Sequence, residues 1–343
     1  MAITILGSNY DTLPGRDKVL KRFSVFNGAG VDLRGVETLD DALDKARINY
    51  GAVKSPIFLQ DGTEIQDHYC VTKSDDNTPL GVVGKDYNPI HNRDAFEIAG
   101  ELVDNFGFQY EAGGASRGSH CVVDDAKTFL VLRGDDVRIG EGDGDIFNTF
   151  AVFRNSFDGS SGIQYRFVMQ RLVCMNGMTR YLGGKKNQLW INIQHSNSVA
   201  DKLMIANETM RNYAKEVDAI KAEANAFMNT HLTRKEFENE VIPMLLSTMK
   251  LNVEDERESN QAKITNVVQK ALSAYDAEDT AAYNGTAYKA ILAMTDFESH
   301  MEPMRDTQNP SIYMNRTLNG MIWTTAIANY LVQTRRIRLL QSI

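Results

Sequence analysis

FRNSFDGSSGIQYRFVMQRLVCMNGMTRY, the segment from Phe153 to Tyr181, carries the clearest structural signals of the chain. Within it, Asp158 and Gly159 form a strong turn signal, because glycine adopts positive φ without a Cβ clash. β-Branched and aromatic residues lie on both sides of this turn, and such residues favour strands. We therefore predict a β-hairpin whose inner face belongs to the core and whose rim carries arginines.

The predicted hairpin and the residues after it form a positive region in an acidic chain. The 343 residues have a formal net charge of −8. Between positions 153 and 186, six cationic side chains stand against one carboxylate, Asp158. The six cations are Arg154, Arg166, Arg171, Arg180, Lys185 and Lys186. This region is therefore the part of the chain best suited to an anionic ligand.

Aromatic residues interleave with these cations, namely Tyr165, Phe167 and Tyr181. Guanidinium groups match phosphate oxygens through paired hydrogen bonds, and aromatic rings offer stacking platforms for bases. We therefore predict that the six cations contact the phosphates of single-stranded nucleic acid, while Tyr165 or Tyr181 stacks on bases. The residues alone also allow a second interpretation, in which the rings are core and the arginines pair with the acidic loop over residues 135–145.

The composition is that of a globular protein with a core. Hydrophobic residues make up 43% of the chain and charged residues 24%. The three cysteines (Cys70, Cys121 and Cys174) are widely spaced and odd in number, which favours a reduced, cytosolic setting over a disulfide framework. The first residues lack the basic and apolar regions of a signal peptide, and no apolar run is long enough to predict a membrane span.

Residues 1–195 read as a strand-rich α+β domain, in which short, mostly antiparallel strands alternate with inserted helices. Thr38 and Asp41 supply an N-cap and an acidic residue three positions later, which predicts the start of a helix. A second helix is predicted to end at Gly107, since glycine is the preferred left-handed residue at helix C-termini. The acidic segment 133–145 is predicted to be a loop.

Residues 196–343 read as a helical domain. Apolar residues recur there in alternating steps of four and three, which predicts one long helix over residues 198–228 with a narrow apolar seam. The seam consists of Val199, Leu203, Ala206, Met210, Tyr213, Val217, Ile220, Ala224 and Phe227. Further helices are predicted from a capping box at Thr233, with an interruption near Pro243, and over residues 260–275, 286–301 and 315–340.

The motifs of several enzyme classes are missing from the chain. It has no phosphate-binding loop of the ATP-hydrolysing type, no HExxH, no paired CxxC and no GxSxG. A metal-dependent hydrolase that uses Asp296, His300 and the carboxylates at 141–145 stays as the weakest alternative. We favour a protein without catalytic residues, metal or cofactor.

Two motifs resemble a known family. Asn155-Ser156-Phe157-Asp158-Gly159-Ser160, followed by the sequence RLVCMN at residues 171–176, is similar to the signature of the phage/plasmid-like protein family, also called domain of unknown function nine-three-two. Other segments agree in order over roughly residues 38–330, among them LGVV at 80–83, YNPIHN at 87–92 and GTAY at 285–288. Gly177 and Met178 depart from the family, which often has Thr-Leu there.

The resemblance implies a phage- or plasmid-encoded protein of DNA metabolism in the host cytoplasm. Within that setting we expect ATP-independent binding and annealing of single-stranded DNA in recombination, by a homo-oligomer with no membrane partner. The alternative from a different class is a viral structural or interaction protein that assembles through the long helix over residues 198–228.

Overall fold

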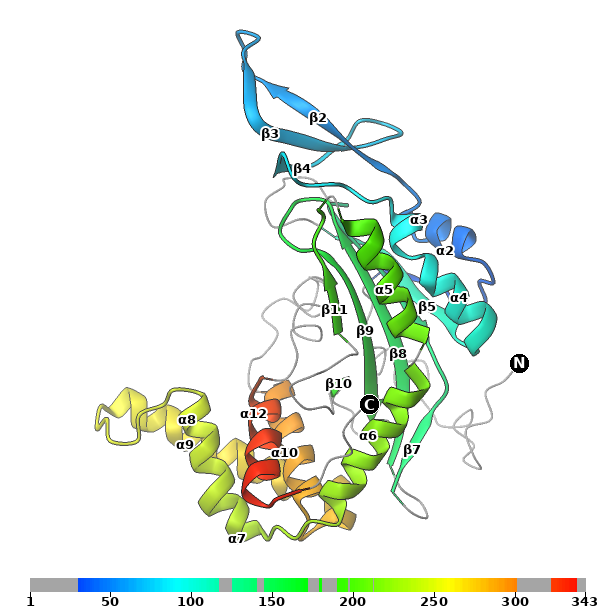
Figure 1. Ribbon diagram of the computed structural model, residues 1–343. Coiled ribbons are helices and arrows are strands. Elements are labelled where there is room, and N and C mark those ends of the chain that lie inside the picture. The colour runs from blue at the N-terminus through cyan, green and yellow to red at the C-terminus, as the bar shows by residue number, and fades with distance from the viewer. Residues whose placement is uncertain are drawn as a thin grey trace.

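The computed structural model describes residues 30–116, 125–140, 145–171, 179–180, 190–196, 198–211, 213–300 and 322–337. Strands dominate the described residues up to Ile193, and the described elements after it are helices (Figure 1). The prediction of an α+β fold with a strand-rich first half and a helical second half is therefore confirmed.

The centre of the first half is a large antiparallel sheet. Among the described residues it has eight strands, in the order β1-β5-β6-β8-β9-β10, with β7 paired to β8 and β11 paired to β9. The strands are β1 (Val31–Asp32), β5 (Gln109–Ser116), β6 (Lys127–Arg133), β7 (Val137–Ile139), β8 (Asp145–Ser156), β9 (Ile163–Arg171), β10 (Thr179–Arg180) and β11 (Trp190–Ile193). The hairpin β8–β9 thus lies inside the sheet, with partners on both sides.

This hairpin is the one that the sequence predicts. Phe153 lies opposite Tyr165, and Val152 lies opposite Arg166. Gly159 in the connecting turn has a φ of 73°, in the left-handed region that favours glycine. The prediction of the hairpin and its turn is confirmed.

Three helices of the first half are α2 (Leu39–Lys45), α3 (Asn92–Ala95) and α4 (Glu97–Phe106). The Thr38 side chain accepts a hydrogen bond from the backbone N–H of Asp41, and Gly107 ends α4 with a φ of 73°. Both predicted helix ends are therefore confirmed.

Helices α3 and α4 cover one face of the large sheet. The Phe96 ring meets the Phe153 ring edge-on at 6.4 Å between centroids. The Tyr165 hydroxyl donates a hydrogen bond to the Ala95 carbonyl, at 2.5 Å. The odd-numbered residues of the β8–β9 hairpin therefore face these helices, since side chains alternate along a strand.

The predicted loop over residues 133–145 is wrong in part, because residues 137–139 form strand β7. Val137 pairs with Phe147, and Ile139 pairs with Asp145. Val137 and Ile139 are buried while Arg138 between them is only half-buried, so a short apolar–polar alternation lies among the carboxylates. Strand β8 accordingly begins at Asp145, the last residue of the predicted loop.

A second, three-stranded sheet projects from the body of the molecule (Figure 1). Its strands β2 (Ala52–Phe58), β3 (Glu64–Lys73) and β4 (Pro79–Gly84) follow one another in space as in sequence. We call residues 52–84 the arm. The register of β2 on β3 shifts between Pro56 and Ile57, which marks a β-bulge in the edge strand.

The predicted long helix corresponds to α5 (Val199–Arg211) and α6 (Tyr213–Met228), which run one after the other along the sheet (Figure 1). The seam residues Val199, Leu203, Ala206 and Met210 are all buried. Helix α5 contacts β11 and α4, and α6 contacts β7 and α10. The seam is therefore covered by elements of the same chain.

The remaining helices form a lobe at the other end of the molecule. They are α7 (Arg234–Glu236), the π-helical turn η2 (Phe237–Val241), α8 (Ile242–Thr248), α9 (Glu258–Tyr275), the 3₁₀ turn η3 (Glu278–Tyr283), α10 (Ala287–His300) and α12 (Ile322–Thr334). Thr233 and Glu236 form the predicted capping box. The π-helical turn immediately precedes α8, where Pro243 lacks a backbone N–H. The last predicted helix ends at Thr334, not near residue 340.

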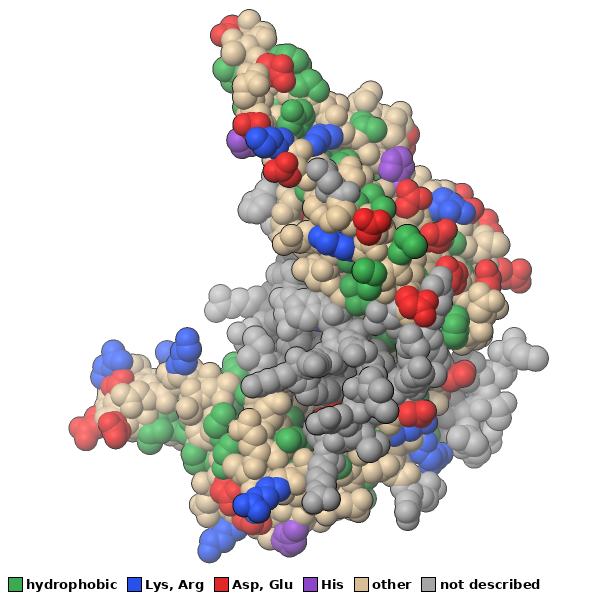
Figure 2. Space-filling view, viewed as in Figure 1, with side chains coloured by type: hydrophobic (Ala, Val, Ile, Leu, Met, Phe, Trp, Pro, Cys, Tyr) green, Lys and Arg blue, Asp and Glu red, His purple; other side chains and the backbone are tan. Residues whose placement is uncertain are grey.

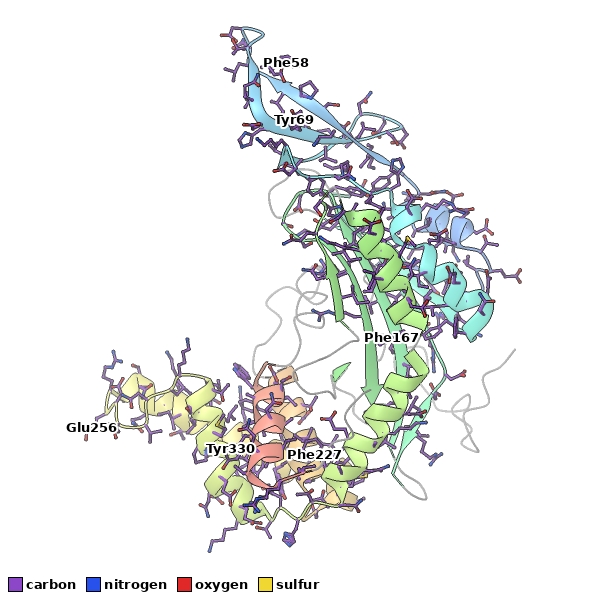
Figure 3. The ribbon with its side chains drawn as sticks, in the orientation of Figure 1. Phe58, Tyr69, Phe167, Phe227, Glu256 and Tyr330 are labelled. Atoms are coloured by element: carbon purple, nitrogen blue, oxygen red, sulfur yellow. The ribbon has the colours of Figure 1, made fainter. Side chains whose placement is uncertain are left out.

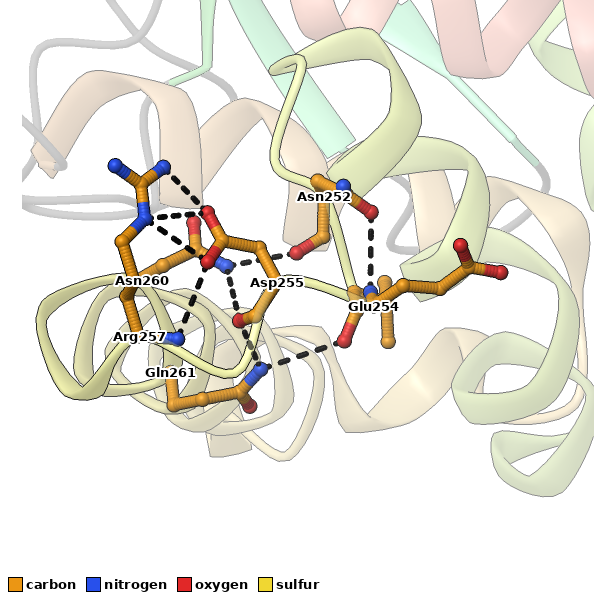
Figure 4. A network of polar contacts seen from close by, with 7 residues as sticks. Asn252, Glu254, Asp255, Arg257, Asn260 and Gln261 are labelled. Carbon is orange, nitrogen blue, oxygen red and sulfur yellow. Dashed lines mark hydrogen bonds and ion pairs between the residues drawn. The ribbon is translucent and has the colours of Figure 1, made fainter.

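The loop between α8 and α9 is fixed by its own polar contacts (Figure 4). Arg257 donates through Nε to both carboxylate oxygens of Asp255, at 2.9 Å each. The Asn260 amide donates to the Asn252 carbonyl at 2.7 Å, and the Gln261 amide to the Asp255 carbonyl at 2.7 Å. These contacts hold the tip of the lobe in one conformation.

One hydrophobic cluster extends from Leu33 to Ile337 and includes residues of both halves. The division into domains 1–195 and 196–343 stays a prediction. No helix in the described part of the chain combines the length and apolar character that crossing a membrane requires.

Candidate nucleic-acid interface

The structure describes the side chains of three of the eight residues predicted to bind nucleic acid: Arg154, Tyr165 and Arg166. Arg171 ends strand β9 and Arg180 ends β10, which pairs with β9. Tyr181, Lys185 and Lys186 lie outside the described residues. The candidate interface is therefore built here from the β8–β9 hairpin and its neighbours.

Tyr165 belongs to the core of the protein. Its side chain is 1% exposed, its ring meets Phe153 edge-on at 5.1 Å, and its hydroxyl binds the Ala95 carbonyl. Phe167 is buried on the same face and packs against Phe108. These rings leave no open face on which a base could stack.

The predicted rim of arginines is wrong for Arg154 and Arg166, whose exposed fractions are 7% and 2%. The alternate residues Phe150, Val152 and Ser156 of β8 are buried on the same face as Arg154, so the second face of the hairpin is covered as well. A charged residue on it is enclosed and not solvated.

Arg154 and Arg166 share this second face with Lys127. Phe129 and Lys127 of β6 lie opposite Arg154 and Ser156 of β8, and Val152 lies opposite Arg166 of β9. Residues opposite one another in antiparallel strands point to the same face. We call Lys127, Arg154 and Arg166 the basic cluster.

The charges of the basic cluster influence one another. Burial, followed by the nearby Arg166, lowers the pKa of Arg154 to about 10, and Asp158 opposes this shift. Burial also lowers the pKa of Lys127, while Asp158 raises it and Arg154 lowers it further. The face is thus a place where positive charge is enclosed at an energetic cost.

We call residues 155–160, which connect β8 to β9, the signature turn. Asp158 of this turn is the carboxylate beside the basic cluster. Burial acts to raise its pKa, but hydrogen bonds from Ser156 and Ser160 outweigh burial and hold the pKa below its usual value. Both serine hydroxyls donate to Oδ1 of Asp158 at 2.6 Å. Lys127 Nζ lies 3.8 Å from Oδ2 of Asp158. Asp158 is therefore a buried, charged residue that fixes the turn.

The signature turn also contacts the base of the arm. A Cβ added at Gly81 of β4 would lie 2.5 Å from the Asp158 Cα. The Tyr87 hydroxyl donates a hydrogen bond to the Ser156 carbonyl at 2.6 Å. The residues that identify this turn in the sequence thus join the arm to the large sheet.

Sequence reasoning missed two buried polar groups near this junction. One is a network in which Asn92 Oδ1 accepts from Thr128 Oγ1 at 2.7 Å and from the Asn155 amide at 3.0 Å. The other is His195, whose ring stacks on Tyr87 at 4.7 Å between centroids. Neither group could be predicted from the spacing of residues, because the residues that contact each other lie far apart in the sequence.

His195 also ties the chain segment after the arm to the large sheet. Its Nδ1 lies 3.2 Å from the Asn88 carbonyl, and its own carbonyl accepts from the Asn88 N–H at 3.1 Å. Burial lowers the pKa of His195 to about 4. The ring is therefore neutral near pH 7, and its geometry indicates a structural role.

The alternative function of a metal-dependent hydrolase needs a metal site. Among the described residues, no group of three or more His, Cys, Asp and Glu side chains could hold an ion. Residues 141–144 and the His300 side chain lie outside the part that is described. Glu298, two positions after Asp296, accepts the N–H groups of Trp323 and Thr324 at 3.1 and 2.9 Å. It therefore caps the start of α12.

These features define an α+β protein whose large sheet carries an enclosed basic cluster and, between β8 and β9, the signature turn. Residues 79–319, more than half of the chain, match the family described as Domain of unknown function (DUF932), and the chain belongs to this family. The matched region contains strand β4, the signature turn and the whole basic cluster. No curated protein and no solved structure matches the chain.

Proposed function

We propose that this chain is a phage- or plasmid-encoded protein of DNA metabolism that binds single-stranded DNA without ATP and promotes its annealing in the host cytoplasm. The observation that supports the proposal is the run of cations Arg171, Arg180, Lys185 and Lys186, which follows the enclosed basic cluster in the chain. Arg154 and Arg166 are enclosed, so we do not assign them to phosphate contacts.

The positive charge of the basic cluster is offset only in part. The nearby Arg166 lowers the pKa of Arg154, and the Asp158 carboxylate opposes that effect. Guanidinium groups bind phosphate oxygens bidentately, which suits Arg171 and Arg180 to phosphate contacts. Neutralised phosphates also repel a complementary strand less, which is what annealing without ATP requires.

The positive charge extends along the chain beyond the basic cluster. Arg171 and Arg180 stand at the ends of β9 and β10, and Lys185 and Lys186 follow in the sequence. We assign these four residues to the phosphate-binding region. Tyr181 is the aromatic residue of the predicted set to which we assign base stacking, since Tyr165 is buried.

The alternative function is that of a structural protein that assembles through the long helix. The burial of the helix seam supports it less well. Leu203 and Met210 of its seam are 9% and 1% exposed, because the seam packs against the chain's own elements. Assembly through these residues would require that packing to open.

Binding can be measured by the fluorescence anisotropy of a labelled single-stranded oligonucleotide across a range of salt concentrations. We expect binding at low salt, with a slope of log affinity against log salt whose magnitude falls by about 0.7 in Arg180→Gln, since each neutralised phosphate of a single strand contributes roughly that amount. Arg180→Lys keeps the charge and should keep the slope. An unaltered protein that leaves the anisotropy unchanged at low salt overturns the proposal.

A triple variant tests the cations outside the basic cluster without disturbing the buried face. Arg180→Gln/Lys185→Gln/Lys186→Gln should reduce the salt slope by about 2. The matched control, Lys235→Gln/Lys263→Gln/Lys270→Gln, removes three exposed lysines of the helical lobe and should leave the slope unchanged. Equal losses in the two variants would indicate attraction by overall charge only.

Annealing is tested separately, by mixing two complementary oligonucleotides with a fluorophore and a quencher in the absence of ATP. The protein should accelerate quenching, and the first triple variant should not. Binding without acceleration would limit the function to strand protection.

A further inference from the structure

A buried ion pair lies beside the base of the arm. Lys127 Nζ is 3.8 Å from Oδ2 of Asp158, and the two side chains are 9% and 0% exposed. Burial lowers the pKa of Lys127, while the Asp158 carboxylate raises it. Separating the partners of such a pair is costly in the interior, because each is left without its counter-charge. The distance between Lys127 and Asp158 is therefore a property that the surrounding structure has to maintain.

The arm holds the beginning of β6, two residues before Lys127. Lys73 at the end of β3 binds Asp125 through its Nζ at 2.6 Å, and the same Nζ lies 4.5 Å from the centre of the Tyr50 ring. The Tyr50 hydroxyl donates to the Asp125 carbonyl at 2.5 Å. Asp125 has a φ of 78°, which is unfavourable for a residue with a Cβ. These contacts therefore fix a backbone position that Asp125 would not adopt by itself.

The arm also holds the signature turn, which carries the other partner of the ion pair. Gly81 of β4 lies against the backbone of Asp158. Tyr87, three residues after the arm, donates its hydroxyl to the Ser156 carbonyl at 2.6 Å. Ser156 lies opposite Lys127 in the pairing of β8 with β6. Both sides of the ion pair are thus positioned by contacts from the base of the arm.

The arm is built to move as one piece. It stands out from the body as a narrow projection (Figure 2), with its three strands paired side by side. Lys54 Nζ lies 4.7 Å from the centre of the Tyr69 ring and donates to the Tyr87 carbonyl at 2.9 Å. Phe58, 56% exposed, lies near the far end, and Tyr69 lies nearer to the body (Figure 3). A displacement of the far end is therefore transmitted to the base.

The base of the arm is closed in the structure. Val71 and Leu80 are both 0% exposed and belong to the hydrophobic core. Displacement of the arm is therefore a local opening of the native protein, of the kind that is measured as a rate of exchange or of chemical modification.

We propose that the position of the arm controls access to the basic cluster. With the arm in place, Lys73, Gly81 and Tyr87 keep Lys127 beside Asp158 and enclosed. When the arm is displaced, the start of β6 and the signature turn separate, and Lys127 becomes accessible to water and to anions. The coupling is reciprocal, so an anion that takes the place of Asp158 at Lys127 favours the displaced arm.

Acetylation of lysines by acetic anhydride, followed by mass spectrometry, tests this coupling without nucleic acid. Lys73→Met removes the bond to Asp125 and the contact with the Tyr50 ring. It should raise the acetylation rate of Lys127 about tenfold, which corresponds to about 1.4 kcal/mol. Lys289, 1% exposed in the helical lobe, is the internal reference and should keep its rate.

Lys85→Met is the matched control. It removes the exposed pair of Lys85 with Asp67, which spans 3.4 Å within the arm and the residue after it, and it should leave the acetylation of Lys127 unchanged. An unchanged rate at Lys127 in Lys73→Met overturns the proposal. Equal increases at Lys127 and Lys289 overturn it as well, because they report loosening of the whole protein.

Hydrogen exchange gives a second measurement, with a variant on the other side of the ion pair. Tyr87→Phe removes only the hydroxyl that binds the Ser156 carbonyl. In Tyr87→Phe and in Lys73→Met, the amides of residues 69–73, 79–84 and 125–131 should exchange faster by a common factor, because they open as one unit. The amides of α9 should be unaffected. Faster exchange in the arm alone, with residues 125–131 unchanged, contradicts the coupling.

These measurements are separate from the test of single-strand binding. The phosphate contacts proposed above are assigned to Arg171, Arg180, Lys185 and Lys186, whereas the arm acts on Lys127. Loss of the salt-dependent binding would therefore leave the coupling between the arm and Lys127 standing, and the reverse also holds.

Discussion

Gly81 of the arm lies directly against Asp158 of the signature turn, so closely that a Cβ on Gly81 would come within 2.5 Å of the Asp158 Cα and 3.0 Å of the Phe157 carbonyl oxygen. The arm and the large sheet therefore meet backbone to backbone. This contact explains why the turn motif and the strand that contains Gly81 belong to one structural unit, although they are far apart in the sequence.

Gly81→Ala should destabilise the protein, because the neighbouring atoms are backbone and cannot rotate away. We expect a loss of about 1–3 kcal/mol in the free energy of unfolding, the usual cost of overpacking. Gly84→Ala on the same strand has no atom within 4 Å of the added Cβ and should change stability by no more than about 0.5 kcal/mol. Urea denaturation of both variants measures the difference, and equal values would contradict the contact.

His195 should make stability depend on pH. Its folded-state pKa, about 4 because of burial, is below its ordinary value near 6.5, so the unfolded chain binds the proton more readily. The contribution is complete above about pH 6.5, shrinks as the pH falls, and levels off near pH 4, with a total of about 3 kcal/mol.

The comparison of His195→Gln with the unaltered chain isolates this contribution. The stability difference between the two proteins should narrow as the pH falls from about 6.5 to 4. His68→Gln, at an exposed position on the arm, serves as the control and should follow the unaltered chain. A pH-independent difference would show that the His195 ring does not titrate as its burial requires.

Asn92→Ala should be strongly destabilising. It leaves the Thr128 hydroxyl, the Asn155 amide and the Ile48 carbonyl without the side chain that they bind, and all of this lies in the interior. Buried polar groups without partners cost about 1–3 kcal/mol each, partly relieved by relaxation, so we expect about 2–4 kcal/mol in total. Asn266→Ala, on the exposed side of α9, should be neutral in the same thermal melts.

Substitution by alanine should affect stability very differently at two adjacent residues of α5. Leu203 is 9% exposed and Met204 is 71% exposed. Leu203→Ala should lower the free energy of unfolding by about 2–4 kcal/mol because it leaves a cavity, whereas Met204→Ala should stay within about 0.5 kcal/mol. If Leu203→Ala instead left stability intact and dissociated an oligomer, the seam would face outward after all.

The local elements could be predicted from the sequence because their signals are local. The Asp158–Gly159 turn, the Thr38 cap and the Gly107 helix end each depend on a few neighbouring residues. Strand β7 was not predicted because its alternation of apolar and polar residues is only three residues long and lies among carboxylates. The helix after residue 315 was predicted too long, because apolar and basic residues continue beyond Thr334 without a breaker.

The candidate site could be predicted only in part, because its assembly depends on register. Arg154 and Arg166 stand twelve positions apart in one hairpin, but their burial depends on what covers that face of the sheet, and no local sequence pattern encodes this. Lys127 joins them only because β6 pairs with β8. Tyr165 was predicted to stack on bases because the sequence alone does not show whether helices cover an aromatic side chain of a strand.

Pro56 stands on the outermost strand of the arm, next to the bulge that follows it. A proline offers no N–H to an incoming strand, and a bulge bends the edge away from straight pairing. The outer edge of the arm is therefore a poor template for a strand of another chain. A projecting sheet with exposed apolar side chains at its end is thereby protected from growing into fibrils.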